Sequence, residues 1–243
     1  MRINDSTSLR ELMLLHRALV RRSQRGLKLR TRLLLAVAVL VAFFVAAPET
    51  VALAFNGYNS AQYADYWVNG HNSNYRTFDD DCANFVSQSL HDPYMGGGYS
   101  YVNAGQTYTD DHNWWMQYLP QINTFQNSNS WSRAQDLYNF LLWTYPGGVP
   151  EGTAHTKAQQ QATYTPDNMV TGDVLFYDWT SDGHIDHTAI QVGIGHDATI
   201  GIYGNYVDQH TPSRYHEFWS LATTNSKWPT TTIHFMHINA ANG

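Results

Sequence analysis

One cysteine is the residue of this sequence best suited to covalent chemistry. Cys82 is the only cysteine among the 243 residues, so it cannot form a disulfide within the chain. Its place after Asp79-Asp80-Asp81 and before CANFVSQSLH predicts the first turn of a helix. The unpaired amides and the dipole of a helix start favour a thiolate, and the amides can also hold an oxyanion. Because the three acidic residues oppose the thiolate, we expect a cationic imidazolium nearby.

A histidine is expected to serve as the base for this cysteine. His187 opens an alternating segment, residues 187–195, and lies on the face opposite the apolar side chains. A strand can hold such an imidazole rigidly against the start of a helix. A third polar group should orient the ring. His210, which follows another predicted strand, is the leading candidate for this role, and Asp208 and Asn205 come next.

The elements that must position these side chains fall into two parts. The spacing of apolar residues predicts helices in the first part of the chain and strands in the second. The predicted helices cover 58–69, 80–91 and 132–143, and the predicted strands cover 173–179, 187–195, 202–208 and 231–238. The polar stretch 146–168 is expected to be a long surface loop. Helices followed by an antiparallel sheet indicate the α+β class.

The first 54 residues have the pattern of a secretory leader. Residues 1–32 hold nine basic and two acidic residues, an apolar run covers 33–47, and Ala52-Leu53-Ala54 offers an A-x-A cleavage site. We expect cleavage after Ala54. An uncleaved membrane anchor is the alternative, although the apolar run is shorter than the about 20 residues of a membrane span. Either way, residues 55–243 are expected to form one domain outside the cytoplasm, secreted or associated with the cell wall.

This expected domain is strongly acidic. Without residues 1–54, 5 of the 14 Lys and Arg residues and 17 of the 20 Asp and Glu residues remain, a formal charge of −12. Such a surface repels nucleic acids and anionic membranes, so we expect neither as a partner beyond the N-terminal anchor. We expect a monomer that acts on a cationic or neutral polar substrate.

The segment 75–88, YRTFDDDCANFVSQ, resembles the cysteine motif of the bacterial putative amidase domain family. In that family a YN…YA helix and an N-x-x-Y loop precede the motif, and both are matched here, at 58–64 and 72–75. The pattern continues with S-W, G-D-V, H-x-A-I and H-T, which are matched at 130–131, 172–174, 187–190 and 210–211. The resemblance covers most of residues 56–221.

The resemblance implies hydrolysis of an amide bond through a thioester. The family is similar to the NlpC-type and CHAP-type peptidoglycan amidases and peptidases, whose papain-like core packs N-terminal helices on an antiparallel sheet. Carried over to this sequence, the resemblance implies Cys82, His187 and His210 as catalytic residues. Peptidoglycan or a related peptide is then the expected substrate, and neither a cofactor nor a metal is expected.

Four residues of the same motif are candidate substrate contacts: Tyr75, Asp81, Asn84 and Gln88. Asp81 is expected both to cap the helix and to receive an amine of the substrate. For Asn84 and Gln88, ordinary polar positions on the protein surface explain the residue types equally well.

Three other functions remain open from the sequence. Residues 182–187 read D-G-H-I-D-H, so Asp182, His184, Asp186 and His187 could bind Zn²⁺ in a metal hydrolase. That alternative leaves the cysteine motif unexplained. The many Trp and Tyr residues could serve a non-catalytic cell-wall-binding module, in which Cys82 is dispensable. An amine acceptor in place of water would make the protein an acyl transferase.

Overall fold

The computed structural model describes residues 55–92, 94–99, 102–103, 112–143, 152–157, 169–198 and 201–239. The leader predicted over residues 1–54 lies outside these ranges. Within them, no helix has both the length and the apolar character that a membrane span requires.

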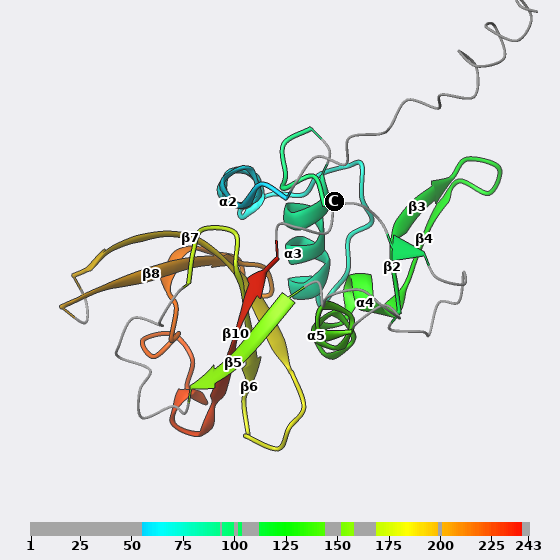
Figure 1. Ribbon diagram of the computed structural model, residues 1–243. Coiled ribbons are helices and arrows are strands. Elements are labelled where there is room, and N and C mark those ends of the chain that lie inside the picture. The colour runs from blue at the N-terminus through cyan, green and yellow to red at the C-terminus, as the bar shows by residue number, and fades with distance from the viewer. Residues whose placement is uncertain are drawn as a thin grey trace, which may run out of the picture. The chain divides into compact units, whose positions relative to one another are not determined.

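The helix that begins at Cys82 is buried along almost its whole length. Every residue of α3 (Cys82–His91) from Cys82 to Leu90 is buried. Three further helices pack against α3 (Figure 1). They are α2 (Gly57–Trp67), α4 (Asn129–Ser132) and α5 (Ala134–Leu142). The helices predicted from the sequence are thereby confirmed. The helix predicted to start near Asp80 starts at Cys82 instead, because Asp81 has non-helical backbone angles.

An antiparallel sheet supports these helices. Its six strands follow the order β5-β10-β6-β7-β8-β9. Their bounds are β5 (Gly152–Lys157), β6 (Val174–Asp178), β7 (His187–Asp197), β8 (Ile202–Gln209), β9 (Arg214–Phe218) and β10 (Thr232–Ile238). Two short hairpins lie apart from it: β1 (Val102–Asn103) with β2 (Asn113–Trp114), and β3 (Met116–Leu119) with β4 (Thr124–Asn127). The α+β class is confirmed.

Two strands of the sheet lie where the sequence predicted none. β5 falls within residues 146–168, which were expected to form a surface loop, and this expectation is wrong for residues 152–157. β5 pairs with β10 along its whole length, from Lys157 opposite Ile233 to Gly152 opposite Ile238. Backbone pairing of an edge strand needs no apolar pattern, which explains why the polar sequence concealed β5. β9 is the second unpredicted strand and pairs with β8 at the other edge.

Each face of the sheet has its own apolar core. On the face covered by the helices, the core includes Phe85, Trp131, Phe176 and Ile190. On the opposite face, a second core includes Leu175, Tyr177, Ala189, Trp219 and Phe235. Because side chains alternate along a strand, adjacent residues of β6 and β7 face different cores. Both α2 and α3 pack against β7, so the start of α3 lies close to this central strand.

Candidate active site

The Cys82 side chain lies where the start of α3 meets the start of β7. The backbone N–H groups of Thr188, in β7, and of Ala83 lie near its sulfur and favour the thiolate. The first intrahelical bond of α3 runs from the Phe85 N–H to the Asp81 carbonyl oxygen, at 2.9 Å. The amides before Phe85 precede that bond and are therefore available to stabilise negative charge. The predicted position of the cysteine in the first turn of a helix is confirmed.

Cys82 is a neutral thiol near neutral pH. Burial, reinforced by the Asp80 carboxylate, raises its pKa from about 9 to about 12, although the Thr188 and Ala83 amides act in the opposite direction. The side chain is only 3% exposed. Since the thiolate is the reactive form, a base must remove the proton during the reaction.

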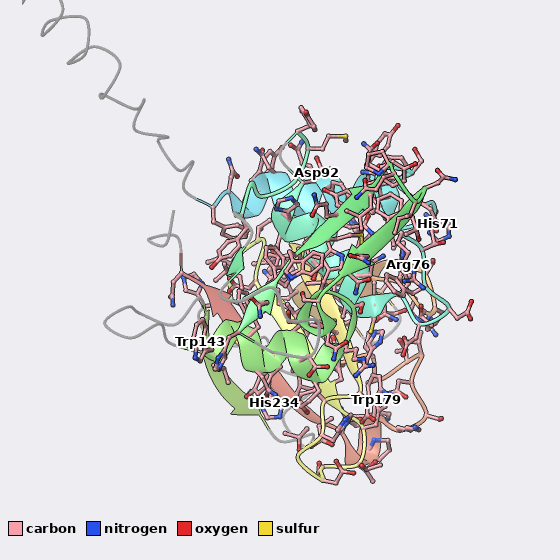
Figure 2. The ribbon with its side chains drawn as sticks, turned by 90° about the vertical axis from the view of Figure 1, so that its right-hand side faces the viewer. His71, Arg76, Asp92, Trp143, Trp179 and His234 are labelled. Carbon is pink, nitrogen blue, oxygen red and sulfur yellow. The ribbon has the colours of Figure 1, made fainter. Side chains whose placement is uncertain are left out.

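His187, the first residue of β7, carries a neutral imidazole. The next residue in the chain is Thr188, whose backbone amide lies near the Cys82 sulfur. The His187 ring stacks on Trp179, just beyond the end of β6 (Figure 2), with ring centroids 5.5 Å apart. Burial lowers the pKa of His187 to about 4, although Gln209 and Asp80 favour the protonated form. The imidazole is therefore unprotonated near pH 7, as a general base must be.

Iodoacetamide is expected to alkylate Cys82 slowly near pH 6 and faster as the pH rises, because the reagent attacks the thiolate and the thiol pKa is about 12. Asp80→Asn should accelerate alkylation at every pH below that value, because Asp80 raises the Cys82 pKa. Mass spectrometry measures the rate directly, since Cys82 is the only cysteine. Asp79→Asn is the matched control. Rapid alkylation at about pH 5 would instead indicate a thiolate–imidazolium pair and contradict this assignment.

Two cavities open beside the pair. One, of about 540 Å³, is lined by Cys82 together with residues of α4, α5 and the turn 184–186. The other, of about 390 Å³, is lined by His187, Gln209 and residues 211–227. Asp80 and Asp186 line both cavities. The thiol and the imidazole thus face adjoining spaces that share a wall.

Gln209, the last residue of β8, is a neighbour of His187 that sequence reasoning missed. Its side chain lies near the imidazole and favours the protonated form of His187. Nε2 of His187 and Oε1 of Gln209 are both buried and have no hydrogen-bond partner among the described residues. β7 pairs with β8 so that Ile190 lies opposite Asp208, which puts Gln209 on the same face as His187. The alternation of β8 was the signal that could have revealed it.

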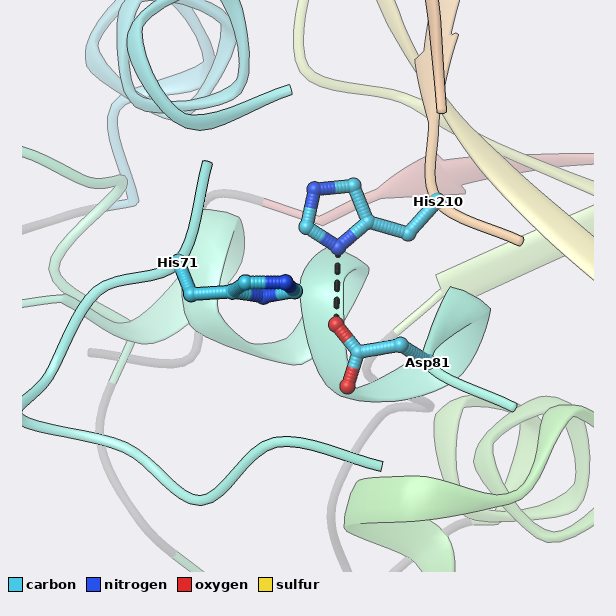
Figure 3. Close-up of side chains that lie close together, drawn as sticks. All are labelled: His71, Asp81 and His210. Atoms are coloured by element: carbon cyan, nitrogen blue, oxygen red, sulfur yellow. Dashed lines mark hydrogen bonds and ion pairs between the residues drawn. The ribbon is translucent and has the colours of Figure 1, made fainter. Parts of the chain in front are cut away.

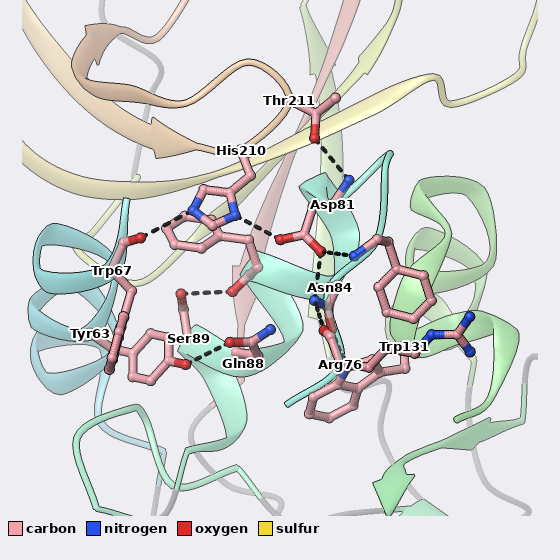
Figure 4. A network of polar contacts seen from close by, with 12 residues as sticks. Tyr63, Trp67, Arg76, Asp81, Asn84, Gln88, Ser89, Trp131, His210 and Thr211 are labelled. Carbon is pink, nitrogen blue, oxygen red and sulfur yellow. Dashed lines mark hydrogen bonds and ion pairs between the residues drawn. The ribbon is translucent and has the colours of Figure 1, made fainter. Parts of the chain in front are cut away.

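His210, predicted as the residue that orients His187, has other partners. Its Nδ1 lies 2.7 Å from Oδ2 of Asp81, and its Nε2 lies 3.1 Å from the carbonyl oxygen of Trp67 (Figures 3 and 4). The ring also stacks on Phe85, with centroids 4.0 Å apart. His210 therefore joins the end of β8 to α2 and to the start of α3, and we do not assign it the orienting role.

The two lower-ranked candidates for that role also lie elsewhere. Asp208 accepts a hydrogen bond from the backbone N–H of His216 at 2.7 Å and lies beside Asp65 of α2. The Asn205 side chain is fully buried. In the part of the chain that the structure describes, Gln209 interacts with His187, and the three predicted candidates do not.

Asp81 and Asn84, which flank Cys82 in the sequence, belong to a buried polar network. Oδ1 of Asp81 accepts from the Phe78 backbone N–H at 3.1 Å and from the Asn84 amide at 2.7 Å (Figure 4). Oδ1 of Asn84 accepts from the indole N–H of Trp131 at 2.8 Å. Asp81 makes no side-chain capping bond to α3, contrary to the prediction. Because these partners belong to the protein, we assign neither residue a substrate contact.

Gln88 and Tyr75, the other predicted substrate contacts, are also buried among protein partners. Oε1 of Gln88 accepts from the Tyr63 hydroxyl at 2.7 Å. The Tyr75 hydroxyl donates to Oδ2 of Asp92 at 3.0 Å, and its ring stacks on Trp131. Most polar residues of the cysteine motif thus hold α3 in place. The exposed carboxylate in this motif that lines both cavities is Asp80.

The residues of the alternative zinc site do not converge. Among the described residues, two groups of three His or Asp side chains bring potential ligand atoms within 4.8 Å of one another, and neither contains residues 182–187. Asp182 instead accepts from the His184 backbone N–H at 2.9 Å, and Asp186 accepts from the Trp179 backbone N–H at 2.9 Å. These carboxylates shape the turn before β7.

Comparison with known proteins places this site in a family. Residues 54–236 match the family described as "Putative amidase domain", which covers most of the chain. The chain belongs to this family. The amidase domain therefore includes α2 to α5, all strands of the sheet except the last two residues of β10, and both Cys82 and His187. Membership indicates a hydrolase that acts on amides.

The amidase domain is also similar to two proteins of Bacillus subtilis (strain 168). It is 27% identical to "Uncharacterized protein YhbB" over 193 residues, which cover 77% of this chain and 51% of that protein. It is 29% identical to "Uncharacterized protein YjcM" over 149 residues, which cover 58% of this chain and 28% of that protein. The chain thus spans about half or less of these relatives' lengths. No solved structure matches significantly.

Proposed function

We propose that this chain is an exported, cysteine-dependent amidase or peptidase that hydrolyses an amide bond through a thioester intermediate. One observation carries the proposal. The Cys82 thiol lies near the backbone amide of Thr188, the residue that follows His187, although the two are about a hundred positions apart in the sequence. Cys82 lines one cavity and His187 lines the adjoining one. A nucleophile, a neutral base and free helix-start amides are the groups that acyl transfer requires.

The protonation states define the first half of the reaction. As the Cys82 sulfur attacks the amide carbonyl carbon, neutral His187 removes the thiol proton. The carbonyl oxygen becomes an oxyanion and is stabilised by backbone amides at the start of α3. The imidazolium then gives its proton to the leaving nitrogen, the carbon–nitrogen bond breaks, and an amine departs. The acyl group remains on Cys82 as a thioester.

In the second half of the reaction, water hydrolyses the thioester with the help of the same residues. His187 removes a proton from water as the water oxygen attacks the thioester carbonyl carbon, and the tetrahedral intermediate again uses the α3 amides. The imidazolium returns its proton to the departing sulfur, which regenerates the Cys82 thiol and releases a carboxylic acid. Gln209 orients the imidazole, and a hydrogen bond between the two side chains is expected to form when substrate fills the cavities.

This arrangement supports a papain-like relationship as part of the proposal. The nucleophile starts a buried helix, the base starts a neighbouring antiparallel strand, and a polar residue on the next strand contacts the base. The order and roles agree with those implied by the sequence resemblance, except that Gln209 takes the third place instead of His210.

The charges around the cavities favour a peptide that carries both an amine and a carboxylate. Three acidic residues line the cavity beside Cys82, namely Asp80, Asp136 and Asp186, together with Arg133. The cavity beside His187 adds Arg214 and Lys227. Peptidoglycan stem peptides carry both kinds of group, so peptidoglycan or a related peptide is the proposed substrate. Asp80 replaces Asp81 as the proposed site for a substrate amine.

Digestion of purified peptidoglycan tests this function. The chain is incubated with peptidoglycan, and new free amines and muropeptides are identified by mass spectrometry. We expect products that iodoacetamide abolishes, because the reagent blocks Cys82, and whose masses identify the cleaved bond. Products that survive iodoacetamide but disappear with EDTA would contradict the cysteine mechanism. If amines are released only from other peptide amides, the mechanism stands and peptidoglycan is excluded as the substrate.

A further inference from the structure

The second group of potential metal ligands lies where α2, β8 and β9 meet. We propose that Asp65, Asp208 and His216 bind a divalent transition-metal ion of the Zn²⁺ class. Asp65 belongs to α2, Asp208 to β8 and His216 to β9. This inference is independent of the proposed amidase function, since none of the three residues takes part in the reaction described above.

The three side chains are already gathered. One ligand atom from each residue lies within 4.8 Å of the others. Nε2 of His216 lies 2.9 Å from Oδ1 of Asp65. The His216 ring stacks on the rings of Tyr206 and Tyr215, nearly parallel to both, with centroid separations of 5.6 and 3.8 Å. This stacking fixes the direction of the imidazole, as a ligand site requires.

A buried carboxylate oxygen without a partner is the observation that points to a ligand. Asp208 is fully buried. Its Oδ1 accepts from the His216 backbone N–H at 2.7 Å, but its Oδ2 has no hydrogen-bond partner. A buried polar atom is costly to leave unsatisfied. The ligand that satisfies this oxygen must therefore carry positive charge or donate a hydrogen.

Asp65 narrows the choice, because one of its carboxylate oxygens lies within 4.8 Å of a carboxylate oxygen of Asp208. Two carboxylates have only acceptors to offer each other, so a shared proton or a cation is needed to hold them together. A metal ion between them would use the unpartnered Oδ2 of Asp208.

The ligand types select the ion. An imidazole nitrogen with two carboxylates suits Zn²⁺ and related transition metals, whereas Ca²⁺ and Mg²⁺ prefer oxygen ligands alone. Side chains of Asp65 and His216 are 39% and 37% exposed, so water can reach the remaining coordination position. Three protein ligands and one water form a common zinc arrangement.

The other group of potential ligands, His71, Asp81 and His210, is a weaker candidate. Its carboxylate and its buried imidazole already bond to each other at 2.7 Å (Figure 3), and the second nitrogen of His210 is bonded to Trp67. A metal there would have to break both of these bonds. In the group around Asp208 a metal would replace one bond, between His216 and Asp65, and would satisfy Oδ2 of Asp208, which has no partner in the described part of the chain. It would also tie α2 to the edge of the sheet.

Zinc titration of the chain tests the proposal. The protein is treated with EDTA, dialysed and titrated with Zn²⁺ by isothermal calorimetry, and its melting temperature is measured with and without the metal. We expect one tight site and a higher melting temperature with zinc. Asp208→Asn and Asp65→Asn should weaken that site at least about tenfold. Asp65 is exposed, so its variant tests binding even if Asp208→Asn folds poorly.

Asp79→Asn is the matched control, because Asp79 is an exposed aspartate outside both ligand groups. It should bind zinc as the unaltered chain does. Absence of a tight site would overturn the proposal and leave a shared proton between the two carboxyl groups. Equal zinc affinity in all variants would also overturn it, since the ion would then lie elsewhere, for instance on other histidines.

Discussion

Cys82→Ala is expected to lower the rate of amide hydrolysis by on the order of 10³- to 10⁶-fold, the range found when a catalytic nucleophile is removed. The thioester cannot form without the sulfur, so the reaction loses its covalent intermediate. The measurement is the release of new amines from the peptidoglycan or peptide substrate, followed by mass spectrometry. The melting temperature of the variant is measured alongside, because Cys82 is buried and truncation leaves a small cavity.

Cys82→Ser separates chemistry from packing. The serine side chain is close in size to the thiol, but its hydroxyl is a much weaker nucleophile without a stronger base. We expect this variant to fold normally and to remain nearly inactive. If Cys82→Ala hydrolyses the substrate at the unaltered rate, Cys82 is a structural residue and the proposed mechanism is wrong.

Asp81→Ala is expected to lower the free energy of unfolding by about 3–5 kcal/mol, the cost of removing one partner from a buried charged network. Asp81 is 3% exposed, and its carboxylate accepts from Phe78, Asn84 and His210. Its removal leaves these buried donors without an acceptor. Urea unfolding, followed by tryptophan fluorescence, gives the free energy.

A neighbouring aspartate provides the control. Asp79 lies in the same loop but is exposed, so Asp79→Ala should change stability by no more than about 0.5 kcal/mol. Asp81→Asn keeps one of the two oxygen acceptors but loses the other and the charge, and an intermediate loss is expected. Equal stability of Asp81→Ala and Asp79→Ala would show that the network contributes little.

The positions of Cys82 and His187 could be predicted because each depends on a local pattern. Acidic residues before a short apolar-patterned segment predict the start of a helix, and strict alternation after His187 predicts a strand. Both elements appear in the structure, α3 from Cys82 and β7 from His187. Their proximity did not follow from these patterns and was suggested by the family resemblance.

The residue beside His187 could not be predicted, because the answer depends on strand register. Gln209 and His210 are adjacent and face opposite sides of the sheet. Only the pairing of Ile190 with Asp208 determines which of them shares the face of His187. Sequence gives no such pairing, so the chemically more versatile histidine was preferred over the glutamine.

The internal partners of Asp81 and Asn84 could not be predicted for a related reason. Polar residues beside a nucleophile suit both substrate binding and internal hydrogen bonding, and a single sequence does not distinguish these uses. The partners that decide the matter, Trp131 and His210, lie 47 and 129 residues away along the chain. Long-range contacts of this kind become visible only in the folded protein.

The burial of α3 has a consequence for how the protein opens. Amide groups of a helix enclosed on all sides exchange with solvent hydrogen only when the surrounding layers separate, which approaches global unfolding. Cys82 begins this helix, so the proposed nucleophile is held by a buried element and not by a mobile loop. Thermal loss of the proposed activity should therefore coincide with loss of the whole domain, and local fluctuation alone should leave the thiol in place.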